Sequence, residues 1–157
     1  MRSYSFLTAW LIEAEREPVY EAIWESERWP QWWPGVVEAT QLEPGGADGT
    51  GRRGRYEWRS RIPYPVRFEV VATRLERPHL LEGDATGDLA GTGRWRLYEE
   101  RGVTAVLYSW EVTAQKRWIR LLGPVADPVF RWNHDQIMRA GAHGLAAELG
   151  VRLLAAS

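Results

Sequence analysis

Six runs of alternating apolar and polar residues, separated by short turn sequences, constrain the fold of this chain more than any other feature. Alternation with a period of two is typical of strands with one buried face. Because most of the connections are only a few residues long, neighbouring strands must pair antiparallel. The runs are VVEATQLE (36–43), RRGRYEWRSR (52–61), PVRFEVVATRLE (65–76), HLLEGDATGD (79–88), GTGRWRLYEE (91–100) and VTAVLYSWEVTA (103–114). They predict an antiparallel meander.

The alternation also assigns the two faces of the predicted sheet. One face is apolar and carries Tyr56, Trp58, Val66, Phe68, Val70, Trp95, Leu97, Val106, Tyr108, Trp110 and Val112. The other face is charged and carries Arg55, Glu57, Arg59, Arg61, Arg67, Glu69, Arg94 and Arg96. We therefore expect the apolar face to cover a core and the charged face to contact water.

The N-terminal part of the chain predicts a strand followed by two short helices. The stretch SYSFLTAWLIEA (3–14) has apolar residues on both sides, which predicts a strand covered on both faces. A short helix is expected from Pro18, because proline is favoured in a first helical turn. The next stretch, RWPQWWPGVV (28–37), is rich in tryptophan, and its prolines allow only a second short helix.

The C-terminal third changes to a helical period. RWIRLLG (117–123) predicts a helical turn that ends at Gly123. Asp127 and Pro128 then predict the N-cap and first turn of a helix that runs to about Glu148. At ~1.5 Å per residue this helix is roughly 30 Å long, which is enough to cross the sheet. Its apolar stripe is Phe130, His134, Ile137, Met138, Gly141, Leu145 and Leu149, and the residues expected off the stripe are Arg131, Asp135, Arg139 and Ala142.

Composition narrows the class of protein. The chain has 157 residues, which fits a single domain over residues 1–157. It has no cysteine, which excludes disulfides, thiol nucleophiles and cysteine-ligated zinc. No apolar run is long enough to span a membrane, and the first residues lack the pattern of a signal peptide, so we expect a cytoplasmic protein. The ten tryptophans suggest a walled pocket or an interface as well as a core.

The predicted order of a strand, two short helices, six antiparallel strands and one long helix resembles the helix-grip fold of the START and birch-pollen-allergen (SRPBCC) superfamily. Within it, the chain is similar to the polyketide cyclase/dehydrase-like group. The motifs that carry the resemblance are PVYEAIWESERWPQWWPGV (18–36), TGDLAGTGRWRL (86–97) and NHDQIMRAGAHGL (133–145). The resemblance implies an α+β fold in which a seven-stranded curved antiparallel sheet surrounds the C-terminal helix and the two short helices close one end.

The resemblance also implies a cavity between sheet and helix that binds a small hydrophobic ligand, either aromatic, polyketide or lipid-like. The residues predicted to face inward are nearly all aromatic or aliphatic, as expected of such a pocket. The candidate ligand-binding residues are Trp29, Trp32, Trp33, Tyr56, Trp58, Phe68, Trp95, Tyr108, Trp110, His134, Met138 and Gly141. The tryptophans of residues 28–37 either wall the mouth of the cavity or plug the end of the sheet. Gly141 either leaves room for a ligand or allows close helix packing.

Few polar groups are predicted inside the cavity. His134 lies in the middle of the helical stripe, where it is either a satisfied core residue or an acid, base or hydrogen-bond donor. His134 and Tyr108 are the best catalytic candidates for the alternative function that the resemblance implies, a polyketide aromatase/cyclase or dehydrase-like enzyme. No cofactor is expected for either function.

Two local patterns suggest other sites and are rejected on context. A GxGxxG pattern at Gly49, Gly51 and Gly54 is followed by a strand, whereas a dinucleotide loop needs a helix there, so it predicts a hairpin loop. His134 and His143 are half a turn out of phase on one helix, so no metal site is expected.

The partners expected from the sequence are small molecules. The arginine-rich run at residues 52–61 suggests nucleic-acid binding, but its arginines alternate with the aromatic residues and lie among glutamates, which favours a solvated sheet face. The net charge of −1 supplies no general attraction to nucleic acid or anionic membranes. We expect a small hydrophobic molecule as partner, with no nucleic acid and no stable membrane insertion, and the sequence leaves a homodimer open.

Overall fold

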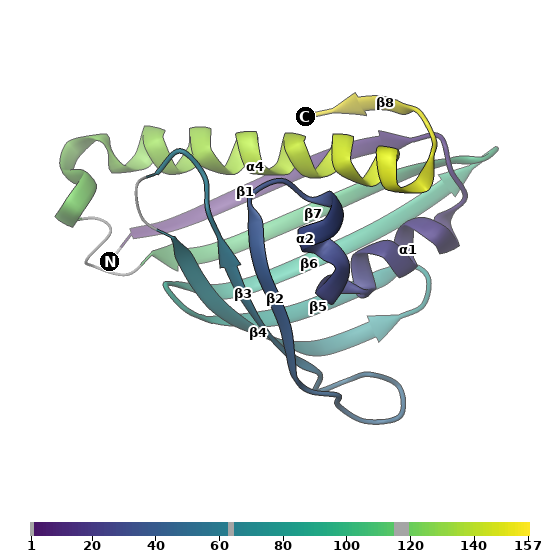
Figure 1. The fold of residues 1–157 in the computed structure, drawn as a ribbon, viewed down its shortest axis with the longest axis horizontal. Helices are drawn as coiled ribbons and strands as arrows, with labels where there is room; N and C mark the ends of the chain where they lie inside the picture. Colours follow the sequence, from purple (N-terminus) through teal and green to yellow (C-terminus); the bar gives the residue numbers. More distant parts are fainter. Residues whose placement is uncertain (1, 63–64, 115–119) are drawn as a thin grey trace.

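The computed structural model describes residues 2–62, 65–114 and 120–157 (Figure 1). The elements are β1 (Arg2–Ile12), α1 (Arg16–Trp24), the 3-10 helix η1 (Ser26–Arg28), α2 (Trp29–Trp32), β2 (Val36–Glu43), β3 (Arg53–Trp58), β4 (Val66–Glu76), β5 (Leu80–Gly87), β6 (Leu89–Glu100), β7 (Val103–Ala114), the 3-10 helix η2 (Gly123–Val125), α4 (Ala126–Leu149) and β8 (Leu153–Ala156). Residues 117–119 of the predicted helical turn lie outside the described residues, and residues 120–122 are helical.

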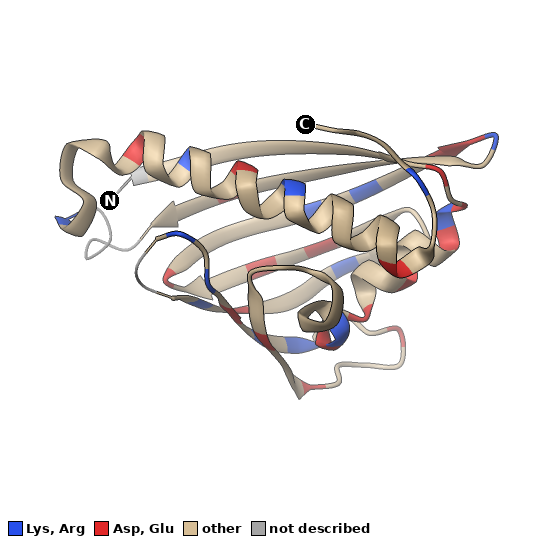
Figure 2. Cartoon of the chain, turned by 45° about the horizontal axis from the view of Figure 1, so that its top comes forward, with Lys and Arg blue, Asp and Glu red and all other residues tan. Residues whose placement is uncertain are grey.

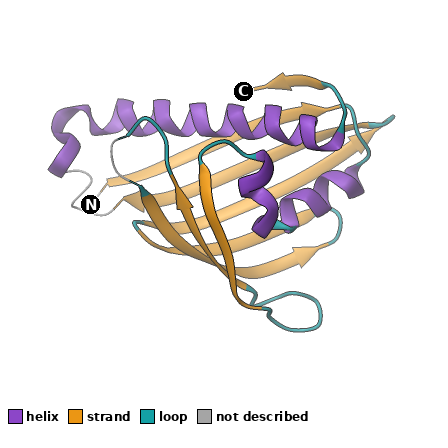
Figure 3. Cartoon of the chain, viewed as in Figure 1, coloured by secondary structure: helices purple, strands orange, loops and turns teal. Residues whose placement is uncertain are grey.

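The strands form one antiparallel sheet in the order β2-β3-β4-β5-β6-β7-β1-β8. All the helices lie on the same side of this sheet, and α4 runs along its concave face (Figure 3). The predicted helix-grip fold is therefore confirmed. The predicted strand number of seven is too low by one, because β8 follows α4 as a strand of only 4 residues, which is too short to show alternation. Gly150 ends α4 with a φ of 67°, and the chain turns back to pair with β1.

β1 is buried on one face, so the prediction of burial on both faces is wrong. Tyr4, Trp10 and Ile12 point inward and are buried. On the other face Leu7 is 74% exposed. β7 and β8 pair with the edges of β1 through the backbone and leave its outer face uncovered. Apolar residues on both sides of a strand therefore do not require two packed layers.

α4 is buried over a wider arc than the predicted stripe. Phe130, Met138 and Leu145 are buried as expected, but Ala142, expected off the stripe, is also fully buried. The curved sheet surrounds the helix, and Ala142 lies one turn after Met138. Asp127 is not the N-cap, which is Val125; it lies in the first helical turn. Among the described helices, none is long and apolar enough to span a membrane.

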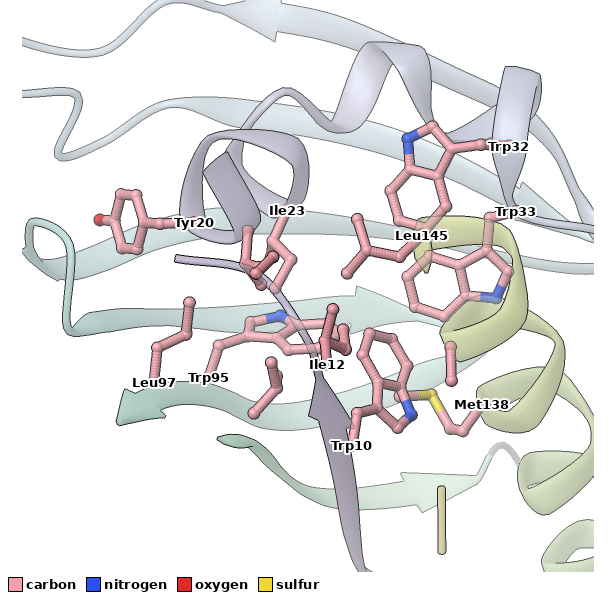
Figure 4. Close-up of a cluster of buried hydrophobic side chains, with 14 of the residues drawn as sticks. Trp10, Ile12, Tyr20, Ile23, Trp32, Trp33, Trp95, Leu97, Met138 and Leu145 are labelled. Carbon is pink, nitrogen blue, oxygen red and sulfur yellow. The ribbon is translucent and has the colours of Figure 1, made fainter. Parts of the chain in front are cut away.

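The main core joins α2, α4 and the sheet through tryptophan. Figure 4 shows Trp33, Met138 and Leu145 pointing into the same core as Trp10 and Trp95. The ring centroid of Trp33 lies 5.7 Å from that of Trp10. Gly141 allows this packing, because a Cβ atom at residue 141 would overlap the indole of Trp33. Close helix packing thus explains this glycine.

Candidate functional site

Two chambers lie between α4 and the sheet. The first has a cavity volume of about 120 Å³, and its lining includes Trp24, Ser26, Trp29, Trp33, Arg52, Tyr56, Trp58, Phe68, Val70, Trp95, Tyr108, Trp110 and Met138. The second has a cavity volume of about 90 Å³, and its lining includes Tyr4, Phe6, Trp58, Phe68, Tyr108, Trp110, Phe130, Asn133, His134, Ile137 and Met138. Five side chains belong to both: Trp58, Phe68, Tyr108, Trp110 and Met138. Both volumes are smaller than those of most small-molecule sites.

The structure brings most of the candidate ligand-binding residues to these chambers. Trp29, Trp33, Tyr56 and Trp95 line the first chamber only, and His134 lines the second only. Trp58, Phe68, Tyr108, Trp110 and Met138 lie between the two. Trp32 and Gly141 are not among the residues that line either chamber.

The tryptophans of residues 28–37 have different places in the structure. Trp33 is buried and donates its indole N–H to the carbonyl of Ile137 at 2.9 Å. Trp29 packs on Trp33, with ring centroids 5.0 Å apart, and both face the first chamber. Trp32 stacks on Trp33, at 5.5 Å between centroids. Trp29 and Trp33 thus wall a chamber, whereas Trp32 packs behind them.

A polar cluster of Ser26, Arg52 and Tyr56 lies in the first chamber. The Ser26 and Tyr56 hydroxyls are 2.6 Å apart, and Arg52 Nη2 donates to Ser26 Oγ at 3.1 Å. Arg52 Nη1 donates to the carbonyl of Trp24 at 2.6 Å, and its guanidinium also pairs with Glu27. Burial raises the pKa of Tyr56 and lowers that of Arg52. The members of this cluster hydrogen-bond one another.

The position of Arg52 corrects the predicted solvated arginine run. Arg52 precedes β3, is only 8% exposed, and packs over the indole ring of Trp24 at 4.3 Å. Arg55, within β3, is exposed as expected. The inward turn of Arg52 depends on the course of the loop before β3, which strand alternation does not describe.

The second chamber holds polar atoms of a different kind. His134 is largely buried, and neither of its ring nitrogens has a hydrogen-bond partner among the described residues. The Oδ1 atom of its neighbour Asn133 is also buried without one. Burial lowers the pKa of His134 to about 4, against the opposing effect of the Asp135 carboxylate, whose Oδ1 lies 3.7 Å from Nδ1. His134 is therefore neutral near pH 7, with one nitrogen as donor and the other as acceptor.

Tyr108 lies at the junction of the chambers. Its ring stacks on Trp95 with centroids 4.0 Å apart, and a Cβ atom at Gly93 would come within 2.9 Å of its hydroxyl oxygen. Gly93 thus makes room for the phenol. Burial raises the pKa of Tyr108, so its hydroxyl stays protonated and can donate a hydrogen bond to a ligand.

The outer face of the sheet carries paired charges. Arg67 and Arg59 donate to the two carboxylate oxygens of Glu57 at 2.6 and 3.0 Å, and these hydrogen bonds lower the pKa of Glu57. Arg94 donates to Glu82 at 2.9 Å. Figure 2 shows both signs of charge on the strands. The arginines of this face are thus interleaved with carboxylates, as the sequence predicted.

The glycine pattern is a hairpin loop, as predicted. Gly49 and Gly51 have φ angles of 91° and 87°, and the chain continues directly into β3, which pairs with β2. In the part of the chain that the structure describes, no three His, Cys, Asp or Glu side chains come close enough together to hold a metal ion.

Several lining residues were not predicted from the sequence. Tyr4 and Phe6 share the inward face of β1 with Trp10. Strand alternation places these residues on one face, but because the other face of β1 is also apolar, the sequence did not show which face is buried. Asn133 adjoins His134 and would have been found by allowing the helix a wider buried arc. Ser26 lies in the short 3-10 helix η1 and Arg52 in the loop before β3, and the sequence offered no periodic signal for either.

Comparison with known proteins agrees with a curved sheet around a long helix. Residues 8–150 match the family described as polyketide cyclase / dehydrase and lipid transport. The chain belongs to this family. No curated protein sequence matches it.

Solved structures with the same fold come from the START and birch-pollen-allergen superfamily. Zhui aromatase/cyclase from Streptomyces sp. R1128 has a TM-score of 0.76 at 12% identity, over 94% of this chain and 93% of its own. A START superfamily protein from Mycobacterium smegmatis has a TM-score of 0.74 at 14% identity, over 94% of this chain and 97% of its own. The di-domain ARO/CYC BexL has a TM-score of 0.71 at 22% identity, over 93% of this chain and 49% of its own. The family member described here thus spans about half the length of the di-domain structures BexL and StfQ. At these identities the similarity shows the fold alone.

Proposed function

We propose that this protein binds a small hydrophobic molecule, aromatic or lipid-like, in the two chambers between α4 and the sheet. The observation that carries the proposal is the wall shared by both chambers, which consists of four aromatic side chains and one methionine. Such a wall offers a large apolar contact area, and methionine adapts to irregular ligand shapes. The few polar atoms beside it provide orientation.

Isothermal titration with a panel of naphthols, anthraquinones and fatty acids tests this proposal. A chamber-filling variant, Val70→Phe, adds a ring to the lining of the first chamber. The same change at Val37, which is 49% exposed on β2, is the matched control. We expect at least one class to bind, with affinity reduced about tenfold or more by V70F and unchanged by V37F, because a ring in the chamber displaces ligand. Absence of binding by every class would reject the proposal.

A second candidate function is catalysis of a cyclase or dehydrase kind on a polyketide-like chain. The specific observation in its favour is the neutral His134, whose ring nitrogens have no hydrogen-bond partner in the part of the chain that the structure describes, in a chamber that Tyr108 also lines. A neutral imidazole can accept a proton during enolisation, and a phenol can donate a hydrogen bond to the developing oxyanion. This candidate predicts that His134→Ala or Tyr108→Phe removes turnover of a poly-β-keto thioester while binding is nearly retained. Equal turnover in both variants and the parent protein would contradict it.

A further inference from the structure

Four buried polar atoms on side chains that line the second chamber have no hydrogen-bond partner among the described residues, and three of them lie on two consecutive residues of α4. These three are Oδ1 of Asn133 and both ring nitrogens of His134, and the fourth is the indole Nε1 of Trp58. Asn133 is only 7% exposed, and both residues line the chamber. Folded proteins rarely keep such atoms unpaired, because the loss of hydration is not compensated. Their grouping in one chamber points to a ligand group that pairs with them.

We infer that the second chamber is a subsite for a hydroxyl-bearing aromatic end of the ligand, of phenol type. The amide oxygen of Asn133 only accepts, whereas neutral His134 offers one donor and one acceptor. A hydroxyl group can donate to the amide oxygen while accepting from the imidazole N–H. A carboxylate cannot donate to Asn133, and a hydrocarbon leaves all three atoms unpaired.

The remaining walls of this chamber favour a flat ring. Phe6 stacks on His134 with centroids 4.0 Å apart. Tyr4 stacks on Phe6 at 5.9 Å and packs against Phe130 at 5.3 Å between centroids. The Tyr4 hydroxyl donates to Asp127 at 2.8 Å, so it is already engaged. Asn133 and His134 therefore supply the only hydrogen-bond acceptors proposed for the ligand in this chamber, and the Trp58 indole and the Tyr108 hydroxyl supply further donors.

The two chambers differ in a way that fixes the direction of the ligand. In the first, Ser26, Arg52 and Tyr56 hydrogen-bond one another. In the second, Oδ1 of Asn133 and the ring nitrogens of His134 have no hydrogen-bond partner among the described residues. The hydroxyl end is therefore placed in the second chamber, and the apolar remainder extends along the shared wall toward the first.

This inference rests on the proposed function, and a matched set of probes separates the two. The probes are naphthalene, 2-naphthol, 2-methoxynaphthalene and 2-naphthoate, titrated calorimetrically into the full chain. 2-Naphthol should bind about tenfold more tightly than naphthalene, because its hydroxyl pairs with atoms that the hydrocarbon leaves unsatisfied. 2-Methoxynaphthalene accepts but cannot donate, and 2-naphthoate carries a charge, so both should bind more weakly than 2-naphthol.

Variants assign the preference to the chamber. Asn133→Leu and His134→Phe should each reduce the preference for 2-naphthol to about threefold or less while naphthalene affinity is kept. Gln136→Leu, on the exposed side of the same helix, should change neither value. Equal binding of naphthalene and 2-naphthol by the parent protein, or an unchanged preference in N133L and H134F, would overturn the inference alone. If none of the four probes binds, the inference is overturned. If the panel of naphthols, anthraquinones and fatty acids also fails to bind, the proposed function is overturned as well. The comparison of probes in the parent protein remains valid even if a variant does not fold.

Discussion

The imidazole of His134 lies almost parallel to the ring of Phe6, with ring centroids 4.0 Å apart and planes inclined by 11°. This contact joins α4 to β1. It places an ionisable ring in an apolar chamber, where the charged form is disfavoured.

The stability of the protein should fall at low pH through His134. The folded-state pKa of His134 is about 4 and its ordinary value is 6.5, so the unfolded chain binds the proton more readily. Stability is therefore complete above about pH 6.5 and is lost as pH falls toward 4, by about 2–3 kcal/mol at pH 4.5. Urea unfolding at pH 7.5 and 4.5, compared between the parent protein and His134→Phe, measures this effect, since other groups titrate alike in both. An equal loss in H134F would contradict it.

Replacement of Gly141 by alanine should destabilise the fold although alanine favours helices. The added Cβ overlaps the indole of Trp33, and such overpacking costs about 1–3 kcal/mol, which exceeds the gain of about 1 kcal/mol in helix propensity. In a Trp33→Leu background the same change should be neutral or stabilising. A double-mutant cycle by urea unfolding measures the coupling, and additive effects would show that Trp33 is not the obstacle.

Arg52 and Arg55 should differ in their contribution to stability. Arg52→Leu removes the partner of the Trp24 carbonyl and the Ser26 hydroxyl and should cost about 2–3 kcal/mol. Arg55→Leu changes an exposed side chain and should cost less than about 0.5 kcal/mol. Thermal and urea unfolding of the two variants test this. A loss of stability in R52L as small as that in R55L would indicate that Arg52 is not a structural residue.

Substitution of Trp29 should mainly reduce ligand affinity, whereas substitution of Trp32 should mainly reduce stability. Trp29→Leu removes a ring from the lining of the first chamber and should weaken binding of a ligand that reaches it. Trp32→Leu removes a ring that is 7% exposed and packs behind Trp33, so it should cost about 2 kcal/mol of stability and leave affinity nearly unchanged. Titration and urea unfolding of both variants give the comparison. The reverse pattern would contradict the roles assigned here.

The sheet could be predicted because its two faces contact different surroundings. In β3, β4 and β6, apolar and aromatic residues alternate with arginine and glutamate, so the period fixes both strand and face. In β1 the outer side is apolar as well, and the exposure of Leu7 could not be seen from the pattern. β8 is too short for alternation to be detected.

The candidate site was predicted where it lies on regular elements. Trp58, Phe68 and Tyr108 follow from strand alternation, and His134 follows from helical spacing. Arg52 was assigned to the wrong face because it lies in the loop before β3, where neither period applies. The close packing of Gly141 depends on a residue more than a hundred positions earlier in the chain, and local sequence carries no such information.

The chambers between α4 and the sheet are proposed to hold an aromatic ligand. The indole ¹H–¹⁵N signals of the tryptophans, recorded during titration with 2-naphthol, test this proposal most directly. Trp58 and Trp110 line both chambers, whereas Trp132 is 43% exposed on α4. Saturable shifts of the Trp58 and Trp110 signals with an unchanged Trp132 signal are predicted. No shift at Trp58 and Trp110, or shifts confined to Trp132, would contradict the account.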